Sequence, residues 1–182
     1  MGSLLFVIHK HKATSLHYDF RLEIGGVMPS WSIPKGPSLD PAVKRLAIPT
    51  TDHEMAYRTF EGVIPQGQYG AGPVMIWDEG TYNPEIEHGD TREEITDRET
   101  ANSLMEEGLR QGELKFRLYG TKLTGSFALI RTHGFGSMKH AWLLIKHRDK
   151  FASAGYDPAD YDVSAHSGRS MKDIEEAAKP PA

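Results

Sequence analysis

Apolar and polar residues alternate strictly over residues 16–23. The apolar positions are Leu16, Tyr18, Phe20 and Leu22, and the polar positions are His17, Asp19, Arg21 and Glu23. Strict alternation predicts a β-strand with its apolar face on a core. Neighbouring side chains on one face of a strand lie about 7 Å apart, so their head groups can converge on a small ligand. An imidazole, a carboxylate and a guanidinium side by side are suited to holding a divalent metal beside an anion.

Short strand-like segments dominate the remainder of the chain. They are Leu4–His9, Val27–Ile33, Arg45–Ile48, Val74–Trp77, Glu113–Leu118, Ser126–Arg131 and Trp142–Lys146. With the alternating segment, predicted as a strand over Leu16–Ile24, this makes eight. Two segments have helical periodicity, roughly Arg92–Arg110 and Met171–Ala178. In the first of them the positions expected to face inward are Ile95, Leu104, Met105 and Leu109. Many short strands with few helices predict a mainly β fold, a closed or nearly closed antiparallel β-barrel with one or two short flanking helices.

The chain is long enough to fill one hydrophobic core, with 182 residues of which 38% are hydrophobic. After Lys150 the sequence mixes small, acidic and proline residues without clear periodicity. We therefore expect a barrel domain over residues 1–150 and an appendage or linker over residues 151–182.

Composition excludes several classes of site. The chain has no cysteine, so disulfides, zinc ribbons and thiol nucleophiles are impossible, and a metal site must use His, Asp, Glu or backbone oxygen. No apolar run approaches the roughly 18 residues of a membrane span, and the segment before Phe6 is too short for a signal peptide. We expect an intracellular, cytoplasmic protein with no membrane partner.

Charge is unevenly distributed behind a net charge of −4. Residues 1–53 carry six Lys or Arg against four Asp or Glu, residues 78–113 three against twelve, and residues 114–150 eight against one. A general nucleic-acid binder is basic overall, and this chain is not. Contact with a polyanion would therefore be local, through the N-terminal third and the 114–150 block, unless these basic surfaces only solvate the barrel.

The first candidate metal site consists of His11, His17 and Asp19. Two imidazoles and one carboxylate leave open positions on an octahedral ion, as a catalytic site requires. His9 shares a face with His11 if the first strand continues, so either can be the ligand. The alternative is that these histidines are ordinary surface or satisfied residues of a barrel. Because ligating imidazoles must be neutral, a metal-dependent activity would fall at acid pH.

Candidate anion ligands follow the metal candidates along the chain. The fork of Arg21 suits a phosphate or carboxylate, although an ion pair with Glu23 is the alternative. His53 and Tyr57 can donate to an anion or move a proton, but from the residues alone a buried structural pair of His53 and Asp52 is the more ordinary interpretation.

The breaker-rich loop at residues 65–73 is rich in glycine but lacks the Gly-Lys-Ser/Thr ending of a phosphate-binding P-loop. The glycine-rich loop is therefore better explained by barrel-corner geometry or by flexibility near a site.

Lys35 and Arg45 could add positive charge at the mouth of the barrel, although such residues more often face solvent.

Five segments together resemble a known family. They are residues 11–23 (HKATSLHYDFRLE), 31–38 (WSIPKGPS), 60–72 (FEGVIPQGQYGAG), 122–131 (KLTGSFALIR) and 142–146 (WLLIK), with Asp52-His53 between the second and third. In this order they resemble the 3′-phosphoesterase domain of bacterial DNA ligase D, over roughly residues 6–150. Several long motifs in register make the resemblance highly specific.

The resemblance implies a β-barrel enzyme that heals DNA 3′ ends in non-homologous end joining. Such an enzyme is manganese-dependent, removes 3′-phosphates and trims 3′-terminal ribonucleotides. By position, the metal ligands match His11, His17 and Asp19, and the groups that contact phosphate match Arg21, His53, Tyr57, Lys35 and Arg45. His17, Arg21, His53 and Tyr57 form the expected catalytic set, and His53 or a metal-bound water is the candidate for protonating the leaving 3′-oxygen.

The chain departs from longer family members at both ends. Longer members have a segment before the first metal-ligand position that can contribute to the active site. We expect 3′-phosphate removal to persist without that segment, and trimming of ribonucleotides to be the activity that is reduced or lost. Residues 161–171 resemble the linker before the ligase, so we expect a stand-alone version or an excised piece. The implied partners are DNA or DNA–RNA 3′ ends on a primer–template duplex, and a separate DNA ligase, polymerase or Ku protein.

Two other functions are open from the residues alone. A non-catalytic module that binds DNA ends would carry a degenerate site, yet every proposed catalytic position holds a competent residue. A non-haem iron oxygenase also uses a His-x-Asp pair with a distant histidine, here His133 or His140. DNA binding without a metal-dependent product would favour the first, and oxygen-dependent turnover of an oxo-acid the second.

Overall fold

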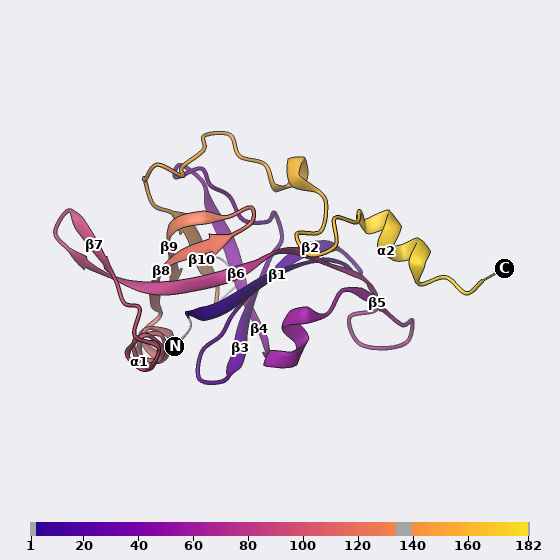
Figure 1. Ribbon diagram of the computed structural model, residues 1–182, viewed down its shortest axis with the longest axis horizontal. Helices are drawn as coiled ribbons and strands as arrows, with labels where there is room; N and C mark the ends of the chain where they lie inside the picture. The colour runs from indigo at the N-terminus through magenta and orange to yellow at the C-terminus, as the bar shows by residue number, and fades with distance from the viewer. Residues whose placement is uncertain (1–2, 134–139, 182) are drawn as a thin grey trace.

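Eight antiparallel strands close into a barrel in the computed structural model, which describes residues 3–133 and 140–181 (Figure 1). The strands are β1 (Leu4–Lys12), β2 (Leu16–Leu22), β3 (Val27–Ile33), β4 (Lys44–Glu54), β6 (Gly72–His88), β8 (Glu113–Gly120), β9 (Thr124–Arg131) and β10 (Trp142–Lys146). Their order around the barrel is β1-β2-β3-β4-β10-β9-β8-β6, and β6 pairs again with β1. The predicted mainly β fold and barrel are confirmed, and all eight predicted strand segments form strands.

Two strands are much longer than their sequence pattern indicated, and two short strands were missed. The prediction of Arg45–Ile48 covers only the start of β4, which has 11 residues. The prediction of Val74–Trp77 covers only the apolar start of β6, which continues for 17 residues because β1 and β8 both pair along it. Two short strands, β5 (Gly62–Ile64) and β7 (Thr91–Glu94), pair with β6 at its two ends. Neither is long enough to show a periodic pattern.

The two predicted helices are present, and the first begins later than expected. Residues 92–94 belong to β7 and not to a helix, because the hairpin from β6 carries them back along the sheet. Helix α1 (Arg98–Gln111) starts after Asp97, whose carboxylate accepts a hydrogen bond from the amide of Thr100, and it ends at Gly112 in the left-handed region. Helix α2 (Met171–Ala177) starts at the capping box of Ser170 and Asp173.

The barrel interior holds the main hydrophobic core. Tyr18, Phe20 and Leu22 of β2 are buried in it, as the alternation predicted, whereas Leu16 at the strand end is exposed. Most of the opposite face of β2 is buried as well, because Arg21 on that face contacts His53 near the end of β4 and Tyr57 of the 3₁₀ helix η1 (Met55–Thr59). The polar face of β2 is thus enclosed and can form a site.

Residues 151–181 lie against the barrel. Tyr156 and Ile174 are buried in the main core cluster, and the amide of Ala165 donates to the carbonyl of Ile76 in β6. A second 3₁₀ helix, η2 (Pro158–Tyr161), precedes α2 in this segment. The division of the chain at residue 150 stays a prediction.

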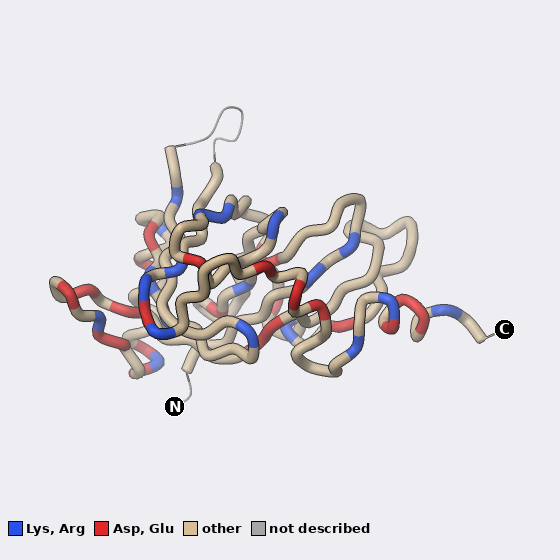
Figure 2. Tube along the Cα trace, turned by 90° about the horizontal axis from the view of Figure 1, so that it is seen from above, with Lys and Arg blue, Asp and Glu red and all other residues tan. Residues whose placement is uncertain are grey.

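The acidic block at residues 78–113 spans most of β6, together with β7 and α1, and the projecting β6–β7 hairpin carries several of its acidic positions (Figure 2). None of the helices in the described ranges is long and apolar enough to cross a membrane.

Candidate functional site

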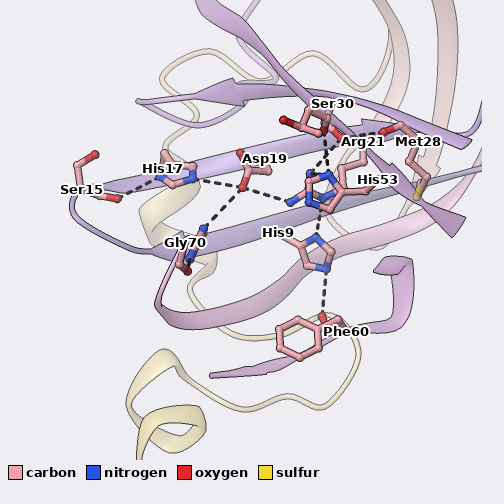
Figure 3. A network of polar contacts seen from close by, with 12 residues as sticks. His9, Ser15, His17, Asp19, Arg21, Met28, Ser30, His53, Phe60 and Gly70 are labelled. Carbon is pink, nitrogen blue, oxygen red and sulfur yellow. Dashed lines mark hydrogen bonds and ion pairs between the residues drawn. The ribbon is translucent and has the colours of Figure 1, made fainter. Parts of the chain in front are cut away.

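Strand pairing between β1 and β2 gathers the candidate residues on the outer face of the barrel. In the register of this hairpin His11 lies opposite His17, and His9 lies opposite Asp19. The rings of His11 and His17 are 5.0 Å apart between centroids. Because side chains alternate along both strands, these four residues and Arg21 all point away from the hydrophobic core. Figure 3 shows most of this network of polar contacts.

His11, His17 and Asp19 form the one group of metal-type ligands found in the described part of the chain. Their ligand atoms all lie within 4.8 Å of one another. The Oδ2 atom of Asp19 is 3.2 Å from Nε2 of His17 and 3.8 Å from Nδ1 of His11. Their convergence on one carboxylate oxygen gives a donor set of two nitrogens and one oxygen, which suits a divalent transition metal.

The outer nitrogen of each imidazole has a backbone partner. Nε2 of His11 donates to the carbonyl of Gly70 at 2.7 Å, and Nδ1 of His17 donates to the carbonyl of Ser15 at 3.1 Å. These contacts leave Nδ1 of His11 and Nε2 of His17 as the nitrogens that face Asp19. Metal-bound histidines typically donate their other ring nitrogen in this way, which fixes both tautomer and ring orientation.

The electrostatics of the triad favour a positive species between its members. Burial opposes ionisation of Asp19, but hydrogen bonds from His11 and His17 and the charge of Arg21 hold the pKa of this carboxyl well below its usual range. The hydrogen bond with Asp19 raises the pKa of His17. Two nitrogen lone pairs aimed at a carboxylate repel it unless a proton or a cation lies between them, so the site is suited to a metal ion.

Arg21 is buried beside the triad and is held on several sides. Its Nη2 donates to Asp19 at 3.3 Å, its Nη1 to the hydroxyl of Ser30 at 3.0 Å, and its Nε to Nδ1 of His9 at 3.0 Å. The guanidinium also lies 5.1 Å from the ring centroid of Tyr57, within cation–π range. Arg21 is thus ion-paired with Asp19, whereas the sequence had left Glu23 as an alternative partner.

His53 and Tyr57 complete the same cavity from β4 and η1. Nδ1 of His53 lies 3.1 Å from Nη1 of Arg21 and 2.9 Å from the carbonyl of Thr51, and its ring is 4.6 Å from that of Tyr57. Burial and the charge of Arg21 lower the pKa of His53, so the ring is neutral near pH 7. Burial raises the pKa of Tyr57, which keeps its phenol protonated.

A cavity of about 500 Å³ brings the predicted metal and phosphate ligands together. His11, His17, Asp19, Arg21, His53 and Tyr57 all line it. The remaining lining residues are Ala13, Thr14, Ser15, Ser32, Thr50, Thr51, Ile64, Tyr69 and Gly70. The hydroxyls among these residues, the guanidinium and the imidazoles make the cavity suitable for an oxyanion beside a cation.

Other sequence candidates lie elsewhere. Lys35 is exposed in the turn after β3, and Arg45 shares its face of β4 with the core residue Ala47; neither occurs among the cavity-lining residues described here. Their contact with phosphate stays a prediction. His133 and His140 are exposed, and within the described ranges neither belongs to the group of metal-type ligands.

Glu23 and Asp52 also lie outside the candidate site and are not among the described cavity-lining residues. The carboxylate of Glu23 accepts from the amide of Leu5 and pairs with Arg98 of α1. Asp52 is exposed, and the described contacts of His53 are with Thr51 and Arg21, so a structural His53–Asp52 pair is not what holds this ring.

Two residues of the network were missed or left open by sequence. Trp31 and Ile33 of β3 face the core, so alternation places Ser30 on the opposite face of that strand. The pattern does not reveal that the hydroxyl of Ser30 contacts Arg21. His9 uses both ring nitrogens, since Nε2 donates to the carbonyl of Phe60 at 3.0 Å while Nδ1 accepts from Arg21. The structure therefore groups His11, and not His9, with His17 and Asp19.

Comparison with known proteins identifies a family model that matches residues 9–131, described as the DNA Ligase D 3′-phosphoesterase domain. The chain is 47% identical over 148 residues to the multifunctional non-homologous end joining protein LigD of Pseudomonas aeruginosa, which covers 81% of this chain and 16% of that protein. It is 44% identical over 135 residues to the multifunctional non-homologous end joining DNA repair protein LigD of Mycobacterium tuberculosis, covering 74% of this chain and 15% of that protein. The Mycolicibacterium smegmatis protein LigD is 41% identical over 135 residues, 74% of this chain and 16% of that protein. The chain thus spans about a sixth of the length of these relatives.

Proposed function

Because the chain belongs to the DNA ligase D 3′-phosphoesterase family, we propose that it is a metal-dependent phosphoesterase that processes DNA 3′ ends for end joining. Its main reaction is hydrolysis of a terminal 3′-phosphate to leave a 3′-hydroxyl. Trimming of a 3′-terminal ribonucleotide at the same site is the second proposed reaction. The observation that carries the proposal is the sharing of one cavity by the metal-type ligands and by Arg21, His53 and Tyr57.

The proposed metal ligands are His11, His17 and Asp19, and the proposed ion is Mn²⁺. The donor set suits several divalent metals, and the family resemblance is the reason for choosing manganese. A bound divalent ion supplies Lewis-acid stabilisation of the charge that develops on the phosphate oxygens. The carbonyls of Gly70 and Ser15 orient the two imidazoles for this role.

Arg21 and His53 are proposed to bind the phosphate oxygens that face away from the ligand triad. The guanidinium is fixed in advance by Ser30, His9 and Asp19, so little reorientation is needed when the charge grows in the transition state. Nδ1 of His53 donates to the carbonyl of Thr51, so the ring has an Nε2–H to donate to a phosphate oxygen only when it is protonated. A bound phosphate dianion would oppose the effect of Arg21 on the pKa of His53 and favour the protonated ring, which could then donate to the leaving 3′-oxygen.

Tyr57 is proposed to orient the phosphate rather than to move a proton. Its ring packs against His9, His53 and Phe60, and this packing fixes where the phenol lies. Its raised pKa keeps the hydroxyl available as a hydrogen-bond donor at neutral pH.

The proposed partners are DNA or DNA–RNA 3′ ends on a primer–template duplex, with a separate ligase, polymerase or Ku protein acting at the same break. The longer relatives are named as non-homologous end joining proteins. A 3′-hydroxyl is the group that ligation or extension of the strand requires, so the proposed product is a substrate for the next enzyme.

The test is turnover of a labelled duplex that ends in a 3′-phosphate, with Mn²⁺ and with a chelator. We expect release of phosphate with the metal and none with the chelator. A second duplex with one 3′-terminal ribonucleotide tests trimming separately. Duplex binding without any metal-dependent product would contradict the proposal and favour the non-catalytic end-binding module.

A further inference from the structure

Tyr69 projects fully into solvent at the edge of the candidate active site. Its relative exposure is 101%, the highest among the exposed large hydrophobic side chains of the described residues. It nevertheless belongs to the residues that line the cavity of His11, His17 and Asp19. An exposed aromatic ring at the rim of a polar cavity offers a large flat surface that the fold itself does not use.

The loop that carries Tyr69 is built from two successive turns. The amide of Gln68 donates to the carbonyl of Pro65 at 3.2 Å, and the amide of Ala71 donates to the carbonyl of Gln68 at 3.1 Å. Gly67 and Gly70 both have positive φ, of 88° and 74°, which glycine adopts without strain. The two turns place Tyr69 at the tip, so its exposure follows from ordered backbone geometry.

The same loop is tied directly to the candidate metal site. The carbonyl of Gly70, next to Tyr69, accepts the hydrogen bond from Nε2 of His11 at 2.7 Å. A Cβ atom at Gly70 would lie 3.4 Å from Cε1 of His11 and 3.9 Å from Ile64, so the backbone packs closely on the imidazole. The backbone of Tyr69 is therefore held next to the ligand triad through Gly70, the residue that follows it.

We propose that Tyr69 is a stacking platform for the base of the 3′-terminal nucleotide, an inference that rests on the proposed function. A 3′-phosphate held at Arg21 leaves its own sugar and base at the cavity mouth, where Tyr69 stands. Aromatic rings stack on every base, so this contact grips DNA ends without reading sequence. A 3′-end enzyme needs such tolerance because breaks occur at any sequence.

The test compares two duplexes with a 3′-phosphate that differ only in whether the terminal nucleotide carries its base or is abasic. The proteins are the wild type, Tyr69→Ala, Tyr69→Phe and the neighbouring control Gln68→Ala, whose side chain is exposed and does not line the cavity. On the ordinary duplex Tyr69→Ala should lower kcat/KM about tenfold, as expected for a lost base–aromatic stack. Tyr69→Phe and Gln68→Ala should match the wild type.

On the abasic duplex the wild type should fall to the level of Tyr69→Ala, and the variant should lose little further. An equal loss on both duplexes would overturn the proposal, as would a Tyr69→Ala variant within about twofold of the wild type on the ordinary duplex. A Tyr69→Phe variant as poor as Tyr69→Ala would also overturn it, because stacking needs the ring and not the hydroxyl.

A binding measurement separates failure of this inference from failure of the proposed function. Terminal 2-aminopurine loses fluorescence when it stacks, so the wild type should quench it and Tyr69→Ala should not. If the wild type releases no phosphate but shows this difference, the proposed hydrolysis is wrong and the stacking platform stands. If the wild type is active and the quenching is the same in both proteins, only the stacking platform is wrong.

Discussion

Nε of Arg21, which lines the cavity, donates a 3.0 Å hydrogen bond to Nδ1 of His9, which does not line it. His9 is fully buried, and its other nitrogen donates to the carbonyl of Phe60. Burial, followed by the charge of Arg21, lowers the pKa of His9 to about 3, so the ring stays neutral and keeps Nδ1 as an acceptor. His9 therefore orients the guanidinium that the proposed mechanism uses, although it does not reach the phosphate.

Replacement of His9 tests this positioning role. His9→Ala should lower kcat/KM for 3′-phosphate release roughly tenfold, because the guanidinium loses one of its fixed partners. His9→Gln should recover part of the loss, since its amide offers both an acceptor and a donor. Steady-state kinetics of Arg21→Ala and of the double variant complete the test. If His9 acts through Arg21, the double variant is no slower than Arg21→Ala; fully additive losses would contradict this.

Arg21→Ala should lower kcat/KM about ten- to a hundredfold, which corresponds to a charge-assisted contact of about 1.5–3 kcal/mol. Arg21→Lys should not restore the rate, because an ammonium group cannot make the separate contacts of the guanidinium with His9, Ser30 and Asp19. Arg110→Ala is the control, since that arginine lies on the exposed surface of α1. A negligible effect of Arg21→Ala would mean that the phosphate binds elsewhere.

Loss of a proposed metal ligand should remove most turnover. Asp19→Ala and His17→Ala each delete one of the three converging ligand atoms, so titration calorimetry should show weaker Mn²⁺ binding in parallel with the lost rate. His88→Ala serves as the control, because that histidine is exposed and pairs with Glu93 on the β6–β7 hairpin. Near-normal turnover of either ligand variant with metal present would refute the assignment.

Glu61 links the cavity side of the barrel to the C-terminal segment and should make folding sensitive to acid. Its carboxylate accepts from the amide of Ile76 and the hydroxyl of Ser167, and it pairs with Arg169 at 3.2 Å. Burial opposes its ionisation, but hydrogen bonds from the side chain of Ser164 and from these three partners hold the pKa of Glu61 below its ordinary value. The group therefore contributes its full stability above its unfolded-state pKa near 4.5, and this contribution is lost as the pH falls from that value through the lower folded-state pKa.

Urea unfolding of Glu61→Gln should give a free energy of unfolding about 1–2 kcal/mol below the wild type at pH 7. The gap should begin to narrow as the pH falls below the unfolded-state pKa of about 4.5 and should close below the lower folded-state pKa, because protonation removes the same charge from the wild type. Glu99→Gln, at an exposed position of α1, should show no comparable gap. A gap that stays constant with pH would contradict the role given to the Glu61 carboxylate.

Local sequence predicted the barrel well because each strand contains a short apolar or alternating segment that identifies it without its neighbours. Tyr18, Phe20 and Leu22 face the core as their spacing indicates. The missed elements depend on pairing and not on local pattern: β5 and β7 are short, and the second half of β6 is specified by its neighbours. The late start of α1 likewise follows from the hairpin that takes up residues 91–94.

Part of the candidate site could likewise be predicted from local sequence, and part of it could not. His17, Asp19 and Arg21 lie two residues apart, so a strand period alone placed them together, with His11 close by. His53 and Tyr57 are more than thirty positions further along, and only the family resemblance selected them. The choice between His9 and His11 needed the cross-strand register and the direction of two hydrogen bonds, which no spacing rule supplies.

The most direct test of the central claim is the position of the metal. Crystals of the wild-type protein grown with Mn²⁺ and a 3′-phosphorylated oligonucleotide would give the ion by anomalous scattering. We expect one strong peak bonded to Nδ1 of His11, Nε2 of His17 and the carboxylate of Asp19, with the phosphate between the ion and Arg21. A manganese peak away from these three residues, or a phosphate bound outside their cavity, would contradict the account.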